Sequence, residues 1–219
     1  MPLPAVQAEL RRQFARWGLP RRVRVDNGHP WGTSSDLPPR LALWLIGLGV
    51  DMDWNDPRQP QQNGKVERSM GTGKRWAEPQ RCPTVTALQT QVDEADWIQR
   101  ECYPVVGGLS RLAAFPELHH SGRRYTRAGE HRSWSLQRVL TFLAEYVVAR
   151  KVWEPGQISV YEQPYYVGKP WIGQTVYVHL DPISAEWVIT DAEDRQLRRY
   201  PAREISKALL VNLISKKDQ

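Results

Sequence analysis

Two acidic residues, Asp26 and Glu67, occur in contexts that suit metal-dependent chemistry on phosphate esters. Asp26 follows the alternating run Arg22–Val25, which predicts a short strand, so a sheet would fix its carboxylate beside an open loop. Glu67 lies in the first turn of a helix predicted over residues 65–76. Mg²⁺ and Mn²⁺ prefer carboxylate and water ligands. Two such ions activate a water or a 3′-hydroxyl and stabilise the leaving oxygen of a phosphodiester.

Each carboxylate also has a simpler interpretation. Asp26 begins the sequence Asp-Asn-Gly, which is typical of a turn. Glu67 is a favourable negative charge near a helix N-terminus. Taken alone, each residue is better explained in this simpler way, and only the two together favour a metal site.

Basic and amide side chains surround Glu67 on the same predicted helix. Cations on a helix beside an active site would contact phosphates and add salt-dependent, sequence-independent affinity for DNA. An ordinary solvated helix face is the alternative. Asn63 lies four residues before Glu67 and would share its face. The candidate DNA-binding residues are Asn63, Lys65, Arg68, Lys74 and Arg75.

The elements that would position these residues alternate between helix and strand. Periodic apolar residues predict the helices, and short alternating runs predict the strands. The segment Pro39–Leu48 is apolar nearly all round, so we expect it to be covered on more than one side. The predicted order is helix Val6–Trp17, strand Arg22–Val25, loop Asn27–Pro39, helix Pro39–Leu48, strand Val50–Trp54, loop Asn55–Gly64, helix Lys65–Trp76 and helix Val85–Cys102.

The second half of the chain differs in composition. Pro104–Ser133 is rich in Gly, Arg and His and is predicted to be an irregular linker, after which Ser135 would cap a helix that extends to Val147. Short β runs after Arg150, separated by turn signals, predict a small barrel or sandwich. Ile205–Gln219 is predicted to be a partly helical tail. The β runs are Ile158–Tyr161, Tyr165–Val167, Thr175–Leu180, Trp187–Thr190 and Gln196–Tyr200.

Composition narrows the class of protein. The 219 residues have a net charge of +6, and residues 1–80, with 12 basic and 8 acidic side chains, contribute most of it. This balance suggests a polyanionic partner. The longest apolar run, Leu41–Val50, is half a membrane span, and the N-terminus has no apolar signal-peptide region. Cys82 and Cys102 are the two cysteines, which excludes a disulfide scaffold and fits a reducing cytosol. We therefore expect a cytoplasmic protein with no membrane partner, associated with the nucleoid when it binds DNA.

Over residues 18–76 the chain resembles the integrase catalytic core of the DDE transposase and retroviral integrase superfamily, and in particular the bacterial insertion-sequence transposases. The resemblance rests on a strand followed by Asp-Asn-Gly, an apolar helix, a Gly-Val strand and then Pro-Gln-Gln-Asn-Gly-Lys-Val-Glu-Arg. It implies an α/β, RNase H-like fold in which Asp26 is the second acid of the triad and Glu67 is the third. It also implies Mg²⁺ or Mn²⁺ as cofactor, DNA as partner, and a small SH3-like β-barrel after the core.

The sequence departs from this family before Asp26. The family's first aspartate lies on the first strand of the core, whereas the 25 residues before Asp26 contain no aspartate. We therefore expect an incomplete core, truncated at the N-terminus, which lacks its first strands and one metal ligand and is inactive alone. Its unpaired strand edge would favour association with another chain. The expected domains are a partial catalytic core with its C-terminal helices (1–103), a linker and helix (104–150), the barrel (151–206) and a tail (207–219).

Three functions remain open from the sequence. The first is a partial transposase or integrase that acts in DNA integration or transposition through divalent-metal chemistry. The second is a non-catalytic DNA-binding or assembly module, which would form a homo-oligomer or bind a full-length transposase. The third is a degenerate reading frame with no retained activity.

Overall fold

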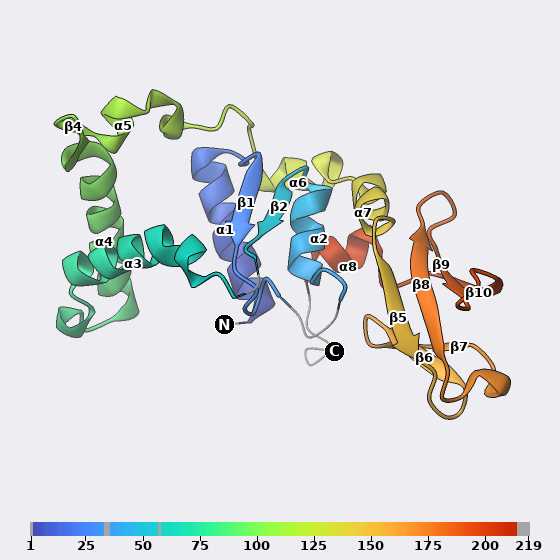
Figure 1. The fold of residues 1–219 in the computed structure, drawn as a ribbon. Helices are drawn as coiled ribbons and strands as arrows, with labels where there is room; N and C mark the ends of the chain where they lie inside the picture. The colour runs from blue at the N-terminus through green and yellow to red at the C-terminus, as the bar shows by residue number, and fades with distance from the viewer. Residues whose placement is uncertain (1, 33–35, 57, 214–219) are drawn as a thin grey trace.

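Helices and strands of the N-terminal segment pack around a two-stranded parallel sheet (Figure 1). The computed structural model describes residues 2–32, 36–56 and 58–213. Strand β1 (Arg22–Val25) pairs with β2 (Asp51–Trp54), and Val25 is opposite Trp54. Helix α1 (Leu3–Trp17) precedes β1, and helix α2 (Arg40–Gly47) connects the two strands. These four predicted elements are confirmed.

Helix α2 forms the centre of the hydrophobic core, as its apolar sequence predicts. Leu41–Leu45 are fully buried. Phe14 of α1 stacks on Trp44, and Trp134 donates its indole N–H to the Trp44 carbonyl over 3.0 Å. Gly47 is required here, because a Cβ at this position would lie 2.1 Å from the Trp134 ring. Neighbours on several sides therefore explain why α2 has no polar residue after Arg40, its first residue.

An ion pair from α1 and a buried hydrogen bond from α2 join these helices to helix α6 (Arg127–Ser133). The carboxylate of Glu130 is fully buried and accepts hydrogen bonds from Arg11, from the Trp44 indole and from the Tyr125 hydroxyl. Burial by itself raises the pKa of this carboxyl, but these donors outweigh the effect and lower the pKa. Because the buried carboxylate is held by donors from three other residues, Glu130 has a structural role.

The C-terminal strands form an open sheet and a separate hairpin rather than the predicted barrel. The sheet is antiparallel with the order β10-β9-β8-β5, and β6 forms a two-stranded hairpin with β7. The sheet stays open because its edge strands, β5 and β10, do not pair with each other in the described residues. The turn at Trp153–Gly156 reverses the chain between β5 and β6 and brings Gln157 into an isolated bridge with Trp153. The hairpin then packs its buried side chains against the sheet. The strands are β5 (Val147–Lys151), β6 (Gln157–Val160), β7 (Gln163–Tyr166), β8 (Thr175–Asp181), β9 (Glu186–Thr190) and β10 (Gln196–Pro201).

Helix α7 (Leu136–Leu143) precedes the sheet, and Ser135 caps it by accepting a hydrogen bond from the Arg138 N–H, as predicted. The predicted extension of this helix to Val147 is wrong, because the β-branched Val147 and Val148 pair with β8 as part of β5. Helix α8 (Lys207–Val211) confirms helical structure in the predicted tail, whose last residues, 214–219, lie outside the described residues.

The predicted irregular linker, 104–133, has more structure than expected. The prediction failed because elements of two to seven residues are too short to show periodicity. Ser110 and Thr126 cap two of its helices. The elements are β3 (Pro104–Val106), β4 (Leu109–Ser110), α5 (Arg111–Ala114), η4 (Pro116–His119) and α6.

Residues 64–119 form an arm that extends from the strand ends and away from the core (Figure 1). In the described residues, the core cluster has no fully buried member between Val50 and Tyr125. Within the arm, α3 packs on α4. The guanidinium of Arg100 stacks on the Trp17 ring of α1 at 3.6 Å. The short helix η1 (Pro60–Asn63) precedes the arm. The arm begins with α3 (Gly64–Ala77), η2 (Pro79–Arg81), α4 (Val85–Trp97) and η3 (Ile98–Cys102), a π-helical turn.

The described part of the chain has no helix that combines the length and the apolar character needed to cross a membrane.

Candidate functional site

The carboxyl ends of β1 and β2 meet at one edge of the small sheet, because the strands are parallel. Asn55 continues β2 and donates its backbone N–H to the Val25 carbonyl over 2.9 Å. The Asn27 side chain donates to the Asn55 carbonyl over 2.8 Å. Two loops that are almost thirty residues apart in sequence are thereby fixed side by side.

Asp26 lies at this edge, directly after β1, and its side chain is exposed. Its Oδ1 accepts a hydrogen bond of 3.1 Å from the Gly28 N–H, so the carboxylate supports the Asp-Asn-Gly turn. The loop is closed by Trp54, whose indole N–H donates to the Trp31 carbonyl over 2.9 Å. Asp26 therefore supports the turn through Oδ1, as its simpler interpretation predicts. Its Oδ2 makes no hydrogen bond in the described residues, so a ligand role is also compatible with the structure.

Asn63 connects α3 to the same strand ends. Its Oδ1 accepts a hydrogen bond of 2.5 Å from the buried side chain of Asn55. Asparagine commonly caps a helix with its side chain, but here the side chain makes no cap bond and serves only this contact. The first turn of α3 therefore begins beside the loop that contains Asp26, as the path of α3 shows (Figure 1).

Glu67 shares a helix face with Asn63, since residues four apart lie one above the other. It is exposed, and within the described part of the chain its carboxylate makes no hydrogen bond or ion pair. It lies in the first turn of α3, so its favourable position near the helix N-terminus is also observed. Of this face, the Asn63 side chain is the part that contacts the strand ends, through Asn55.

In the described residues, the strand ends carry candidate oxygen ligands but no preformed metal cluster. Asp26 and Glu67 are the acidic candidates, and the described residues contain no group of three His, Cys, Asp or Glu side chains that would hold a metal. A further oxygen, Asn55 Oδ1, is buried at the strand ends without a hydrogen-bond partner. Amide and carboxylate oxygens with water suit Mg²⁺ or Mn²⁺.

The cations of α3 lie on two faces. Helical spacing places Lys65, Arg68 and Arg75 on one face, three and seven residues apart, whereas Lys74 follows Glu67 by seven residues and shares its face. All four side chains are exposed. Arg75 makes one long contact, 3.5 Å, to the Thr72 hydroxyl. The lysines and Arg68 have no partner in the described residues, so these charges are available to an anion.

Sequence analysis missed Asn55, the residue that joins the predicted site residues. One signal was present: Asn55 directly follows a predicted strand, as Asp26 does, and polar residues after parallel strands meet at one edge. The prediction that Asn63 shares the face of Glu67 stands, and the structure adds its partner. A comparison of the sequence with models of known protein families finds no match.

Proposed function

We propose that this chain is the DNA-binding part of an integrase-type transposase core, in which Asp26 and Glu67 hold a divalent cation at the strand ends. The proposal is supported above all by the hydrogen bond between Asn55 and Asn63, which brings the first turn of α3 to the loop of Asp26. On this proposal, β1, α2, β2 and α3 correspond to part of an RNase H-like core. The open sheet and the β6–β7 hairpin correspond to the SH3-like module.

The exposed face of α3 formed by Lys65, Arg68 and Arg75 is the proposed DNA contact. Each phosphate contact contributes a slope of about −0.9 to the dependence of log affinity on log salt concentration. Three contacts give a slope of about −2.7, so affinity falls roughly 40-fold between 50 and 200 mM salt. The test is fluorescence anisotropy of a labelled duplex over this salt range, with the protein in which all three residues are changed to Gln.

We expect the triple variant to bind more weakly and its salt slope to decrease in magnitude by about 2.7. The matched control removes the same charge elsewhere, from exposed residues that have no partner in the described part of the chain. Unchanged binding by the α3 variant, or an equal loss in the control, would reject α3 as the contact. The control residues are Arg132, Lys151 and Lys169, each changed to Gln.

The metal site has its own test. Mn²⁺ binding is measured from the electron paramagnetic resonance signal of the free ion, for the wild-type chain and for Asp26→Asn and Glu67→Gln. We expect Mn²⁺ to bind the wild-type chain and each variant to lose most of the affinity, because each removes one carboxylate ligand. Binding that neither variant alters would remove both residues from the site.

The second candidate function is a DNA-binding module without catalysis. It is favoured by one observation, the lack of a third acidic side chain beside the two carboxylates in the described residues. The two functions share the α3 contact and differ in the response to metal. A module of this kind binds DNA equally well with Mn²⁺ and with a chelator, whereas the metal-dependent site predicts tighter binding with Mn²⁺.

A further inference from the structure

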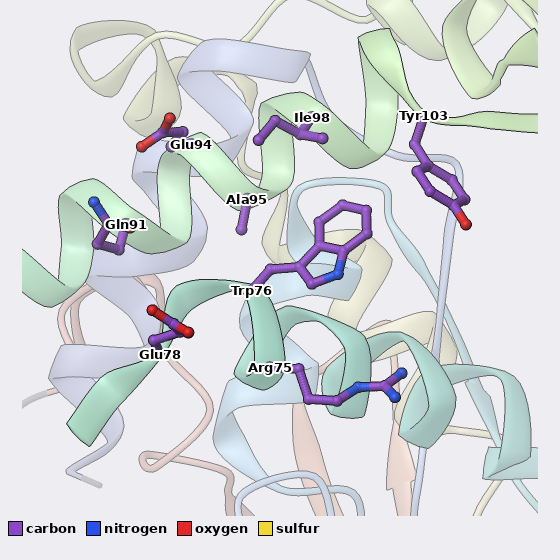
Figure 2. Close-up of a pocket in the computed structure, with 8 residues that line it drawn as sticks. All are labelled: Arg75, Trp76, Glu78, Gln91, Glu94, Ala95, Ile98 and Tyr103. Atoms are coloured by element: carbon purple, nitrogen blue, oxygen red, sulfur yellow. The ribbon is translucent and has the colours of Figure 1, made fainter. Parts of the chain in front are cut away.

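A pocket of about 470 Å³ lies between α3 and α4, at the end of α3 that is distant from Asn63 (Figure 2). Ala95 and Ile98 form its apolar floor, and the Trp76 indole stands between the two helices. The Tyr103 ring lies on one side of the indole, with ring centroids 5.3 Å apart and an edge-to-face angle of 61°. The pocket thus offers an aromatic surface to a planar ligand.

The rim of the pocket has one unpaired carboxylate. Glu78 forms an ion pair with Arg81 at 2.7 Å. The side chains of Glu94 and Gln91 on α4 make no hydrogen bond within the described residues. Figure 2 shows the Arg75 guanidinium directed away from Glu94, at the opposite side of the pocket. The rim therefore combines hydrogen-bond acceptors on α4 with a cation on α3.

The pocket adjoins the cationic face of α3. Trp76 follows Arg75 by one residue, about 100° further round the helix. A nucleic-acid strand that follows Lys65, Arg68 and Arg75 would reach the mouth of the pocket at the last of these residues. Basic side chains that follow a backbone, with an aromatic ring on which a base stacks, are the combination that binds single-stranded nucleic acid.

We propose that this pocket binds one unpaired nucleobase of DNA held along α3, and that Glu94 favours bases with an exocyclic amino group. The base would stack against Trp76 while its amino group donates to the Glu94 carboxylate. Cytosine, adenine and guanine have such a donor, and thymine has none. The inference depends on the proposed DNA binding and adds a site to it.

The experiment compares the affinity of the 219-residue chain for a blunt duplex and for the same duplex with one unpaired 3′ cytosine, by fluorescence anisotropy. Stacking of one base contributes roughly 5- to 150-fold in affinity, the equivalent of about 1–3 kcal/mol. We expect the wild-type chain to prefer the unpaired base by a factor in this range. Trp76→Ala should abolish the preference and leave the salt slope unchanged.

The control is Trp97→Ala, which removes a half-exposed tryptophan of α4 that does not line the pocket. It should retain the preference. Glu94→Gln tests base selection without disturbing packing, because Glu94 is exposed. We expect the wild-type chain to bind an unpaired cytosine about tenfold more tightly than an unpaired thymine, as a hydrogen bond to a charged acceptor allows. The variant keeps only a neutral, weaker acceptor, so its cytosine-to-thymine ratio should be clearly smaller than that of the wild-type chain.

The results that would reject the pocket inference differ from the results that would reject the proposed function. DNA binding with no preference for the unpaired base rejects the pocket inference alone, and no DNA binding rejects both. If Trp76→Ala loses helical structure by circular dichroism, the cytosine-to-thymine ratio of Glu94→Gln decides. Saturable quenching of tryptophan fluorescence by N-acetyl-arginine amide that Trp76→Ala abolishes, without a preference for the unpaired base, would assign the pocket to a cationic protein side chain instead.

Discussion

Replacing Asn63 by alanine should loosen α3 from the strand ends without affecting the core. The change removes the acceptor of the 2.5 Å hydrogen bond from Asn55, whose side chain is buried. A buried polar group left without its partner costs about 1–3 kcal/mol. Because core packing does not include α3, this free energy should appear as local opening of the first turns of α3. Opening becomes roughly 5- to 150-fold more frequent.

The assay is amide hydrogen exchange followed by mass spectrometry, with peptides covering residues 60–77 compared with peptides from β8 and β9. Exchange should accelerate by the stated factor in the first set and stay unchanged in the second. Asn63→Asp is the matched control, since it keeps an oxygen acceptor for Asn55 and should exchange like the wild-type chain. Unaltered exchange over 60–77 in Asn63→Ala would refute the reasoning, as would equal acceleration in both sets.

Two further predictions concern the core. Glu130→Gln leaves Arg11 partly buried without its carboxylate and should lower the free energy of unfolding by about 3 kcal/mol in urea titrations. The pKa of Glu130 is lowered in the folded state, so its contribution is present above the ordinary pKa of 4.5 and is lost as pH falls through the folded-state value. The variant should therefore lose less stability than the wild-type chain below pH 4.5. A parallel pH dependence of the two would contradict this. Gly47→Ala should destabilise by about 1–3 kcal/mol, because the new Cβ meets the Trp134 ring; an unchanged melting temperature would show that the ring moves freely.

The local pattern of apolar and polar residues was sufficient to predict the elements around Asp26. The run Arg22–Val25 alternates, and Pro39–Leu48 is apolar nearly all round, and each signal has one favoured structural solution. The five predicted β runs in the second half were also correct as strands. The predicted barrel was wrong, because alternation identifies a buried face but does not say which strand lies next to it. In the described residues the edge strands β5 and β10 do not meet, so the sheet is open.

The relation between Asp26 and Glu67 was only partly predictable. The sequence placed each carboxylate on an element, and spacing placed Asn63 on the face of Glu67. The contact that joins the elements is a hydrogen bond between two side chains, Asn55 and Asn63, which lie at the two ends of the segment between β2 and α3. No periodicity encodes a contact of that kind, and asparagine in a loop is most often explained by turn geometry.

Two contacts, Asn55 with Asn63 at the start of α3 and Arg100 of η3 with Trp17, link α3 and the arm to the strand ends and to α1, and their strength bears on ligand binding. The side-chain hydrogen bond from Asn55 contributes about 1 kcal/mol, and the stacking of Arg100 on Trp17 contributes about 0.5–2 kcal/mol. A ligand present at 100 times its dissociation constant contributes about 2.7 kcal/mol to the state that it binds. Ligand binding and the contacts of α3 are therefore of similar magnitude. DNA on the cationic face, or Mn²⁺ at the strand ends, should slow exchange over residues 60–77 by more than it changes exchange in the core.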